Sequence, residues 1–316
     1  MSKFCLIVDA SCDIPASYNA MPCLRILPTQ IEVAGTKMMD TRDPVQTLAF
    51  YSKYLHDSQS RTGKSDALTE DQMITTINRA IATNFDEALG VFVSSERSPI
   101  YQRAKRAAAR ARFETLPARL QAGKVGPISA DCVDSTALFA GYGAQVLDLL
   151  DLATKGAGLA QVLERQTATA PQTYAYMVPG NVDFILERAA LKGEKSVSAL
   201  AGFAAKTLFI TPIIRGHRNL TGPVGRKFGQ TKARDAMLEM VQRQIESRNL
   251  LSPHIAFSFT GQLDEVKDMH SYNQLLAAAT KADVQVHLAQ MSMTAAINVG
   301  PQSLSVGFIG KEHAFV

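Results

Sequence analysis

Three short segments gather the hydroxyl and charged side chains that could bind a ligand. The first, residues 93–99, has the sequence Val-Ser-Ser-Glu-Arg-Ser-Pro and carries Ser94, Ser95 and Arg97. It follows an apolar run and precedes an alanine-rich stretch, so its hydroxyls and backbone amides would meet at a strand-to-helix junction, where anions bind weakly. Capping of the helix by Ser98, with the other serines in water, is the more ordinary explanation.

The other two segments have the composition of exposed turns. Residues 61–65 are Arg-Thr-Gly-Lys-Ser and supply Thr62 and Lys64, whereas residues 298–301 are Asn-Val-Gly-Pro and supply Asn298. Glycine, proline and asparagine favour turns for conformational reasons that need no ligand. A binding role arises if these segments lie beyond the carboxyl ends of the strands of an α/β sheet, where such sheets bind ligands.

The motifs of several enzyme classes are missing from the sequence. It has no glycine-rich phosphate-binding fingerprint and no Gly-x-Ser-x-Gly elbow. Its six histidines show no paired metal-ligand spacing, and neither do its four cysteines. We therefore expect no metal and no cofactor, and a serine hydrolase has little support.

Composition and charge describe a soluble globular protein. Apolar residues make up 46% and charged residues 20% of the chain, and the formal charge of +4 is too small to indicate nucleic acid or an anionic membrane. The first apolar run ends at Asp9 and is shorter than a signal-peptide core, and the apolar stretch 199–214 contains Lys206 and is too short to span a bilayer. We expect a cytoplasmic protein with reduced cysteines and no integral membrane association.

Predicted strands and helices alternate along the first half of the chain, and they must position the three segments. Apolar runs predict strands at Phe4–Val8, Ala88–Val93 and Pro127–Val133. Between them, Asp43 and Pro44 are suited to start one helix, and a capping box over residues 69–72 starts another. This alternation predicts a parallel sheet with helices on both faces.

The segment 153–158, Ala-Thr-Lys-Gly-Ala-Gly, interrupts this rhythm and is the best candidate for a domain boundary. We predict an N-terminal α/β domain with a parallel sheet over residues 1–158 and a C-terminal α/β domain with a mixed sheet over residues 159–316. The predicted strands of the second domain are Thr173–Met177, Leu208–Ile214, Ile255–Phe259, Val284–Leu288 and Leu304–Phe308.

A basic stripe marks the helix predicted over residues 101–112. Arg103, Arg106 and Arg110 recur at helical spacing on one face. The stripe is compatible with a solvated face, with a docking surface for an acidic protein, or with a nucleic-acid contact. No aromatic stacking platform or helix-turn-helix signature accompanies it, so no nucleic-acid partner is expected.

An ordered set of motifs along almost the whole chain resembles the DegV family. The most specific piece is the pattern Ser-Ser-x-x-Ser-x-x-Tyr-Gln at residues 94–102. The other matching pieces, in order, are Asp9–Pro15, Ile26–Pro28, Gly35, Asp40, Thr62, Asp134-Ser135, Thr211–Ile214, Gly229 and Gly300-Pro301.

This resemblance implies two α/β lobes with a long-chain fatty acid held between them and its carboxylate fixed by polar residues. It further implies a non-catalytic lipid carrier, which in some bacteria is the acyl-carrying subunit of a fatty acid kinase. Burial of the acyl chain is enough for tight binding in an apolar tunnel, because each methylene that leaves water stabilises the complex by about 0.8 kcal/mol.

The head-group site of the family carries over only in part. Thr62, Ser94 and Ser95 match the family's hydroxyls. The arginine of its Gly-Gly-Arg turn falls near residues 194–196, which contain no arginine, and Asn298 stands where the family has histidine. A cation could instead come from Arg97, Lys64 or Lys195, and Arg97 is the first choice because it lies in the serine segment itself.

Three alternatives stay open at this stage. The ligand could be an ester or another neutral lipid, because a carboxylate without a cation is costly to bury. The chain could be a regulatory or nucleic-acid-binding protein that uses the helix at 101–112. Less well supported is an acyl hydrolase or transferase that uses Ser94 or Ser95.

Overall fold

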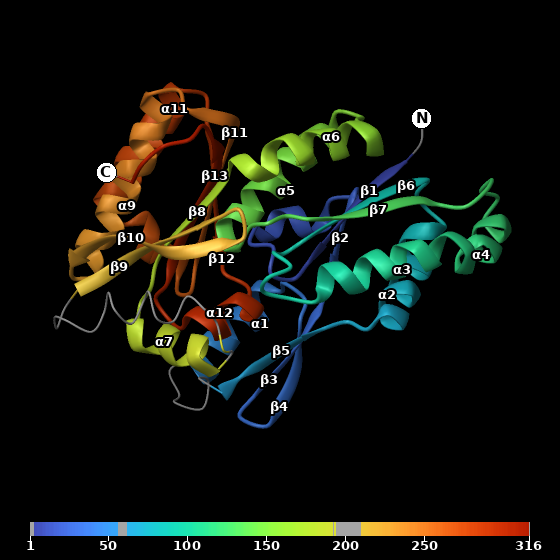
Figure 1. Cartoon of the computed structure of the whole chain (residues 1–316), viewed down its shortest axis with the longest axis horizontal. Helices are drawn as coiled ribbons and strands as arrows, with labels where there is room; N and C mark the ends of the chain where they lie inside the picture. The colour runs from blue at the N-terminus through green and yellow to red at the C-terminus, as the bar shows by residue number, and fades with distance from the viewer. Residues whose placement is uncertain (1–2, 56–61, 192, 194–209, 316) are drawn as a thin grey trace.

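The computed structural model describes residues 3–55, 62–191, 193 and 210–315, and folds them into two α/β lobes (Figure 1). The sheet of the first lobe has the strand order β2-β1-β6-β7, and each neighbouring pair is parallel. Its strands are β1 (Phe4–Asp9), β2 (Leu24–Leu27), β6 (Glu87–Phe92) and β7 (Ser129–Asp134). The central strand β1 is buried along its whole length, as a parallel strand covered on both faces must be.

Local signals determine the starts of the helices in this lobe. The side chain of Asp43 accepts a hydrogen bond from Gln46 N, and both hydrogen bonds of the capping box between Thr69 and Gln72 are present. The helices are α1 (Pro44–Phe50), α2 (Glu70–Ile77), α3 (Ile100–Glu114) and α4 (Leu116–Gln121), with short helical turns η1 (Ala16–Ala20), η2 (Tyr51–Leu55) and η4 (Asn78–Ala82).

A small antiparallel sheet, in the order β4-β3-β5, extends from the first lobe. Pro28 separates β2 from β3 (Thr29–Val33), and the two strands join different sheets. The other strands are β4 (Thr36–Asp40) and β5 (Lys64–Ala67). Ile31 and Phe50 pack with Ile297 of helix α12 (Met293–Val299), so this sheet connects the first lobe to the second.

The second lobe contains a mixed sheet in the order β10-β9-β8-β13-β11-β12. Its pairs are antiparallel except for the parallel pair β11–β12. The strands are β8 (Thr173–Val178), β9 (Ile210–His217), β10 (Leu220–Phe228), β11 (Leu250–Phe259), β12 (Gln285–Gln290) and β13 (Leu304–Gly310). The fold class predicted from the sequence, a parallel-sheet lobe followed by a mixed-sheet lobe, is confirmed.

Helices α9 (Gln230–Glu246) and α11 (His270–Lys281) share an apolar core with one face of this sheet. Further helical segments are α6 (Leu159–Thr169), η5 (Ala170–Gln172), α7 (Val182–Leu191) and α10 (Leu263–Lys267). None of the helices in the described part of the chain combines the length and apolar character needed to cross a membrane.

Helix α5 (Phe139–Thr154) lies between the lobes and packs on β1 as well as on β8, β11 and β13 (Figure 1). The close approach requires Gly307 of β13, because a Cβ there would lie 2.2 Å from the carbonyl carbon of Ala140. The helix begins at Phe139, and in the turn before it Ser135 Oγ accepts a hydrogen bond from Ala137 N. The domain boundary at 158/159 stays a prediction, since α6 beyond it packs on both α5 and β6.

A buried polar cluster also joins the lobes. The carboxylate of Asp13 lies 3.5 Å from Arg42 Nη1 and accepts a hydrogen bond from Ser292 N. Arg42 Nη2 donates to the Gln290 carbonyl, and Asp40 accepts from the backbone and the hydroxyl of Thr294. Burial raises the pKa of Asp13 to about 6 although Arg42 opposes that shift.

Candidate functional site

A cavity of about 770 Å³ opens between the lobes, and both of them line it. This volume falls within the range of pockets that hold small ligands. Its apolar wall is formed largely by α7, β8, β9 and α12 of the second lobe and by the start of α5. The apolar lining residues are Ala67, Val93, Ile100, Leu138, Phe139, Met177, Ile185, Leu186, Leu191, Ile214, Ala295 and Val299.

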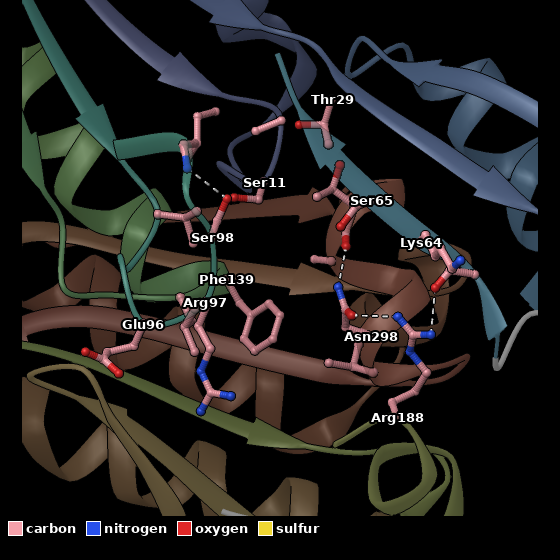
Figure 2. A pocket seen from close by; sticks show the side chains of 18 of the residues that line it. Ser11, Thr29, Lys64, Ser65, Glu96, Arg97, Ser98, Phe139, Arg188 and Asn298 are labelled. Carbon is pink, nitrogen blue, oxygen red and sulfur yellow. Dashed lines mark hydrogen bonds between the residues drawn. The ribbon is translucent and has the colours of Figure 1, made fainter. Parts of the chain in front are cut away.

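Four of the sequence candidates line this cavity: Thr62, Lys64, Arg97 and Asn298. They come from segments far apart in the chain, and the fold brings them to one space. Figure 2 shows Arg97 on one side of Phe139 and Asn298 on the other. Lys195 and the neighbouring residues 194 and 196 lie outside the described residues.

Ser94 and Ser95 of the first segment are not among the residues that line the cavity. Ser94 Oγ donates to Asn219 Oδ1 at 2.6 Å, across to the turn between β9 and β10. Ser95 Oγ lies 2.5 Å from Asp134 Oδ2, and Ser95 N donates to the same carboxylate. A head-group role for Ser94 and Ser95 therefore stays a prediction. In that role the two hydroxyls would have to break these hydrogen bonds and donate to the ligand instead.

Other hydroxyls do reach the cavity, among them Ser98 and Ser11 (Figure 2). Ser98 Oγ accepts a hydrogen bond from Ile100 N, the first residue of α3, although the N-cap of that helix is Pro99 and not Ser98 as the capping explanation expected. Ser11 N and the hydroxyl of Ser11 both bond to Asp9, whose other oxygen accepts from Val93 N at 2.9 Å. Burial raises the pKa of the Asp9 carboxyl above its usual value.

Arg188 lines the cavity although the sequence reasoning did not single it out. It lies on α7, is only 5% exposed, and lines the cavity beside Asn298 (Figure 2). Its Nη1 donates to the Gly63 carbonyl at 2.6 Å, and its Nη2 donates to Asn298 Oδ1 at 3.0 Å. The usable signal was its spacing: Arg188 falls three residues after Ile185 and three before Leu191, on the apolar side of a helix.

Asn298 was expected in a turn and lies instead in the last turn of α12. Gly300, with φ of +78°, ends that helix in a conformation that favours glycine. Because Asn298 Nδ2 donates to the Thr294 carbonyl at 2.8 Å, the amide oxygen faces Arg188. These hydrogen bonds within the second lobe thus orient the amide and the guanidinium together.

The basic stripe on α3 is paired with acidic side chains. Arg103 lies 3.1 Å from Asp66, and Arg106 lies 2.5 Å from Glu70. Arg110 lies 3.0 Å from Asp71, which leaves less positive potential at this face than the sequence alone suggests. The geometry gives no specific support to a nucleic-acid interface.

Within the described ranges, no group of three or more histidine, cysteine, aspartate or glutamate side chains is arranged to hold a metal ion. The three thiols of Cys5, Cys12 and Cys132 are buried, and burial raises the pKa of each above its usual value. Thiols in that state are weak nucleophiles.

Comparison with known proteins places these features in context. The family model described as "Uncharacterised protein, DegV family" matches residues 3–311. A DegV domain-containing protein of Xanthomonas campestris pv. campestris is 26% identical over 310 residues, which cover 98% of each chain.

Two solved structures share the fold. A protein of Eubacterium ventriosum described as a stearic acid-binding protein superposes with a TM-score of 0.75 at 16% identity, covering 98% of this chain and 99% of that one. A DegV family protein of Thermus thermophilus, described by its fatty acid binding, gives a TM-score of 0.73 at 17% identity, covering 98% and 100%. The family match over nearly all of its length shows that this chain belongs to the DegV family.

Proposed function

We propose that this protein holds a long-chain fatty acid in the cavity between its lobes and presents the carboxyl group to a partner, such as a fatty acid kinase. The observation that carries the proposal is the composition of the cavity, which joins a continuous apolar wall to a cluster of polar side chains. A fatty acid has the same division into a long apolar chain and one small polar group.

The apolar wall suits the acyl chain. Met177, Ile185, Ile214 and Val299 belong to one apolar cluster of the second lobe that opens on the cavity. An acyl chain there would replace water against these side chains at about 0.8 kcal/mol for each buried methylene. The protein would thereby solubilise a molecule that water excludes.

The polar side suits presentation to a partner. Thr62 and Lys64 line the cavity and are themselves exposed. A carboxyl group held near them would be reachable by another protein, so the carrier itself needs no catalytic group. We propose that turnover occurs only when the partner kinase and its phosphate donor are present.

The first test is mass spectrometry of the lipid extracted from protein purified without denaturation. We expect one long-chain fatty acid per chain, and delipidated protein should rebind hexadecanoate with the same stoichiometry. A folded protein that carries no acyl lipid and does not take up hexadecanoate would overturn the proposal. The kinase step is tested separately, by asking whether the fatty acid kinase of the same organism phosphorylates the loaded carrier's fatty acid.

A further inference from the structure

We infer that Arg188 binds the ligand's carboxylate and makes this site select ionised fatty acids over neutral lipids of the same chain length. The inference rests on the proposed function and names the group that decides its head-group specificity. It also explains how the site works with an asparagine at position 298 and no arginine in residues 194–196.

Arg188 is positioned where a carboxylate head group would lie, next to the apolar wall that would hold the acyl chain. Its helix borders the apolar wall through Ile185 and Leu186, and its guanidinium lies at the polar side of the same cavity. A carboxylate bound there would have its acyl chain directed along α7. Planar guanidinium groups bind carboxylates through parallel hydrogen bonds, which lysine cannot provide.

The surroundings hold the guanidinium in one orientation. The Gly63 carbonyl anchors Nη1 from the first lobe, and Asn298 Oδ1 anchors Nη2 from the second. A cation fixed in advance loses little freedom on binding, which increases the affinity it contributes.

Charge explains the selectivity. Moving a carboxylate from water into a largely apolar cavity is unfavourable unless a cation and hydrogen-bond donors replace its hydration. An alcohol or ester with the same chain gains the apolar contacts but has no negative charge, so it cannot form the ion pair with two parallel hydrogen bonds that a carboxylate forms. The acid should therefore bind more tightly than the alcohol by a factor that depends on Arg188.

Arg97 is the rival for this role, because it also lines the cavity. It lies across Phe139 from Arg188 and beside Glu96, whereas Arg188 is the more deeply buried of the two (Figure 2). A cation in a drier environment interacts more strongly with a carboxylate. The two arginines can be separated by substituting each with methionine, which is apolar and unbranched.

The experiment compares hexadecanoate with hexadecan-1-ol by calorimetric titration of delipidated protein. We expect Arg188→Met to weaken hexadecanoate binding about 10- to 100-fold, the range for losing hydrogen bonds to a charged group. Hexadecan-1-ol should change by less than about threefold because its apolar contacts remain. Arg110→Met, which removes a surface arginine, is the matched control and should leave both ligands unaffected.

A second variant tests the same idea without removing the arginine. Asn298→Asp places a carboxylate at the position of an oxygen 3.0 Å from Arg188 Nη2. This internal anion should occupy the guanidinium and weaken hexadecanoate binding about as much as Arg188→Met does, with hexadecan-1-ol again little changed.

The outcomes distinguish the inference from the proposed function. If both variants keep the wild-type preference for the acid, Arg188 is not the selecting cation. The same conclusion follows if Arg97→Met alone removes that preference. If wild-type protein binds neither ligand, the proposed function fails and this inference fails with it.

Discussion

Two buried arginines at the junction of the lobes contrast in what they bind. Arg42 is 6% exposed and Arg188 is 5% exposed. The first is positioned by Asp13 at 3.5 Å and by two backbone carbonyls, and it is not among the residues that line the cavity. The second donates to the Gly63 carbonyl and to Asn298 while facing the cavity.

The contrast suggests how to tell a buried arginine that stabilises the fold from one that binds a ligand. A buried arginine beside a built-in carboxylate completes an ion pair, and removing it leaves the other charge uncompensated. A buried arginine that lines a cavity is suited to an anion that arrives from outside. We therefore expect Arg42 to govern folding stability and Arg188 to govern ligand affinity.

The largest expected effect is on folding stability, and it tests the role of Arg42. Arg42→Met should lower the free energy of unfolding by about 3–5 kcal/mol, because Asp13 would remain buried without its cation. Urea denaturation of the ligand-free protein measures this. Arg188→Met is the paired comparison and should cost less, about 1–2 kcal/mol, because it removes the donor of two neutral acceptors, the Gly63 carbonyl and Asn298 Oδ1. Equal losses in the two variants would break the comparison.

A second interlobe contact predicts a dependence on pH. His254 Nδ1 lies 3.1 Å from His287 Nε2, and the Tyr18 hydroxyl lies 3.3 Å from His287 Nδ1. Burial lowers the pKa of both histidines, that of His287 to about 4. Nearby charges are Asp148, Asp151 and Lys155, which act on His254 in opposing directions.

The sign follows from linkage. A histidine whose pKa in the folded protein is below its unfolded value of about 6.5 stabilises the fold above that pH. This stability should be lost as the pH falls from 6.5 towards 4. Asp13, with its raised pKa, acts in the opposite direction and is the same in every variant compared.

The measurement is therefore a difference between two proteins. Between pH 7 and pH 4.5, wild type should lose more unfolding free energy than His287→Gln, which lacks the titrating ring. Urea denaturation at several pH values gives both curves. Parallel curves would show that the histidine pair does not link the lobes in a pH-dependent way.

The smallest expected effect concerns the serines of the first segment. Ser94→Ala breaks a hydrogen bond between lobes and should lower the free energy of unfolding by about 1–2 kcal/mol, because Asn219 Oδ1 loses its donor. Ser95→Ala should cost less, since Asp134 keeps hydrogen bonds from Ser95 N and Thr136 N.

Hexadecanoate affinity should change less than about threefold in both variants, as expected for hydroxyls whose protons are already donated. A tenfold loss in Ser94→Ala would instead assign that hydroxyl to the head group.

Much of the architecture could be predicted because its signals are local. Asp43 caps α1 and Thr69 caps α2 through residues three positions away, and the apolar run at Phe4 forms the buried strand β1. The small sheet β4-β3-β5 was missed, since its strands are short and their pairing depends on residues that are distant in sequence. The last two residues of α12, Asn298 and Val299, were taken for part of a turn because they immediately precede a Gly-Pro pair.

The candidate site shows where this local reasoning stops. Thr62, Lys64, Arg97 and Asn298 were found from their types and motif positions, and all of them line the cavity. The orientation of each side chain was not available in the sequence: Ser94 bonds to Asn219, which is 125 residues away.

The sequence by itself determined the kinds of elements, the family resemblance and the polar segments that can meet at the sheet edges, because capping, periodicity and motif order act within a few residues. Only the tertiary structure decided which polar groups face the ligand. Arg188 meets Gly63, 125 residues earlier, and Asn298, 110 residues later. Whether a charged side chain can be buried depends on such distant hydrogen-bond partners, and no local sequence pattern encodes them.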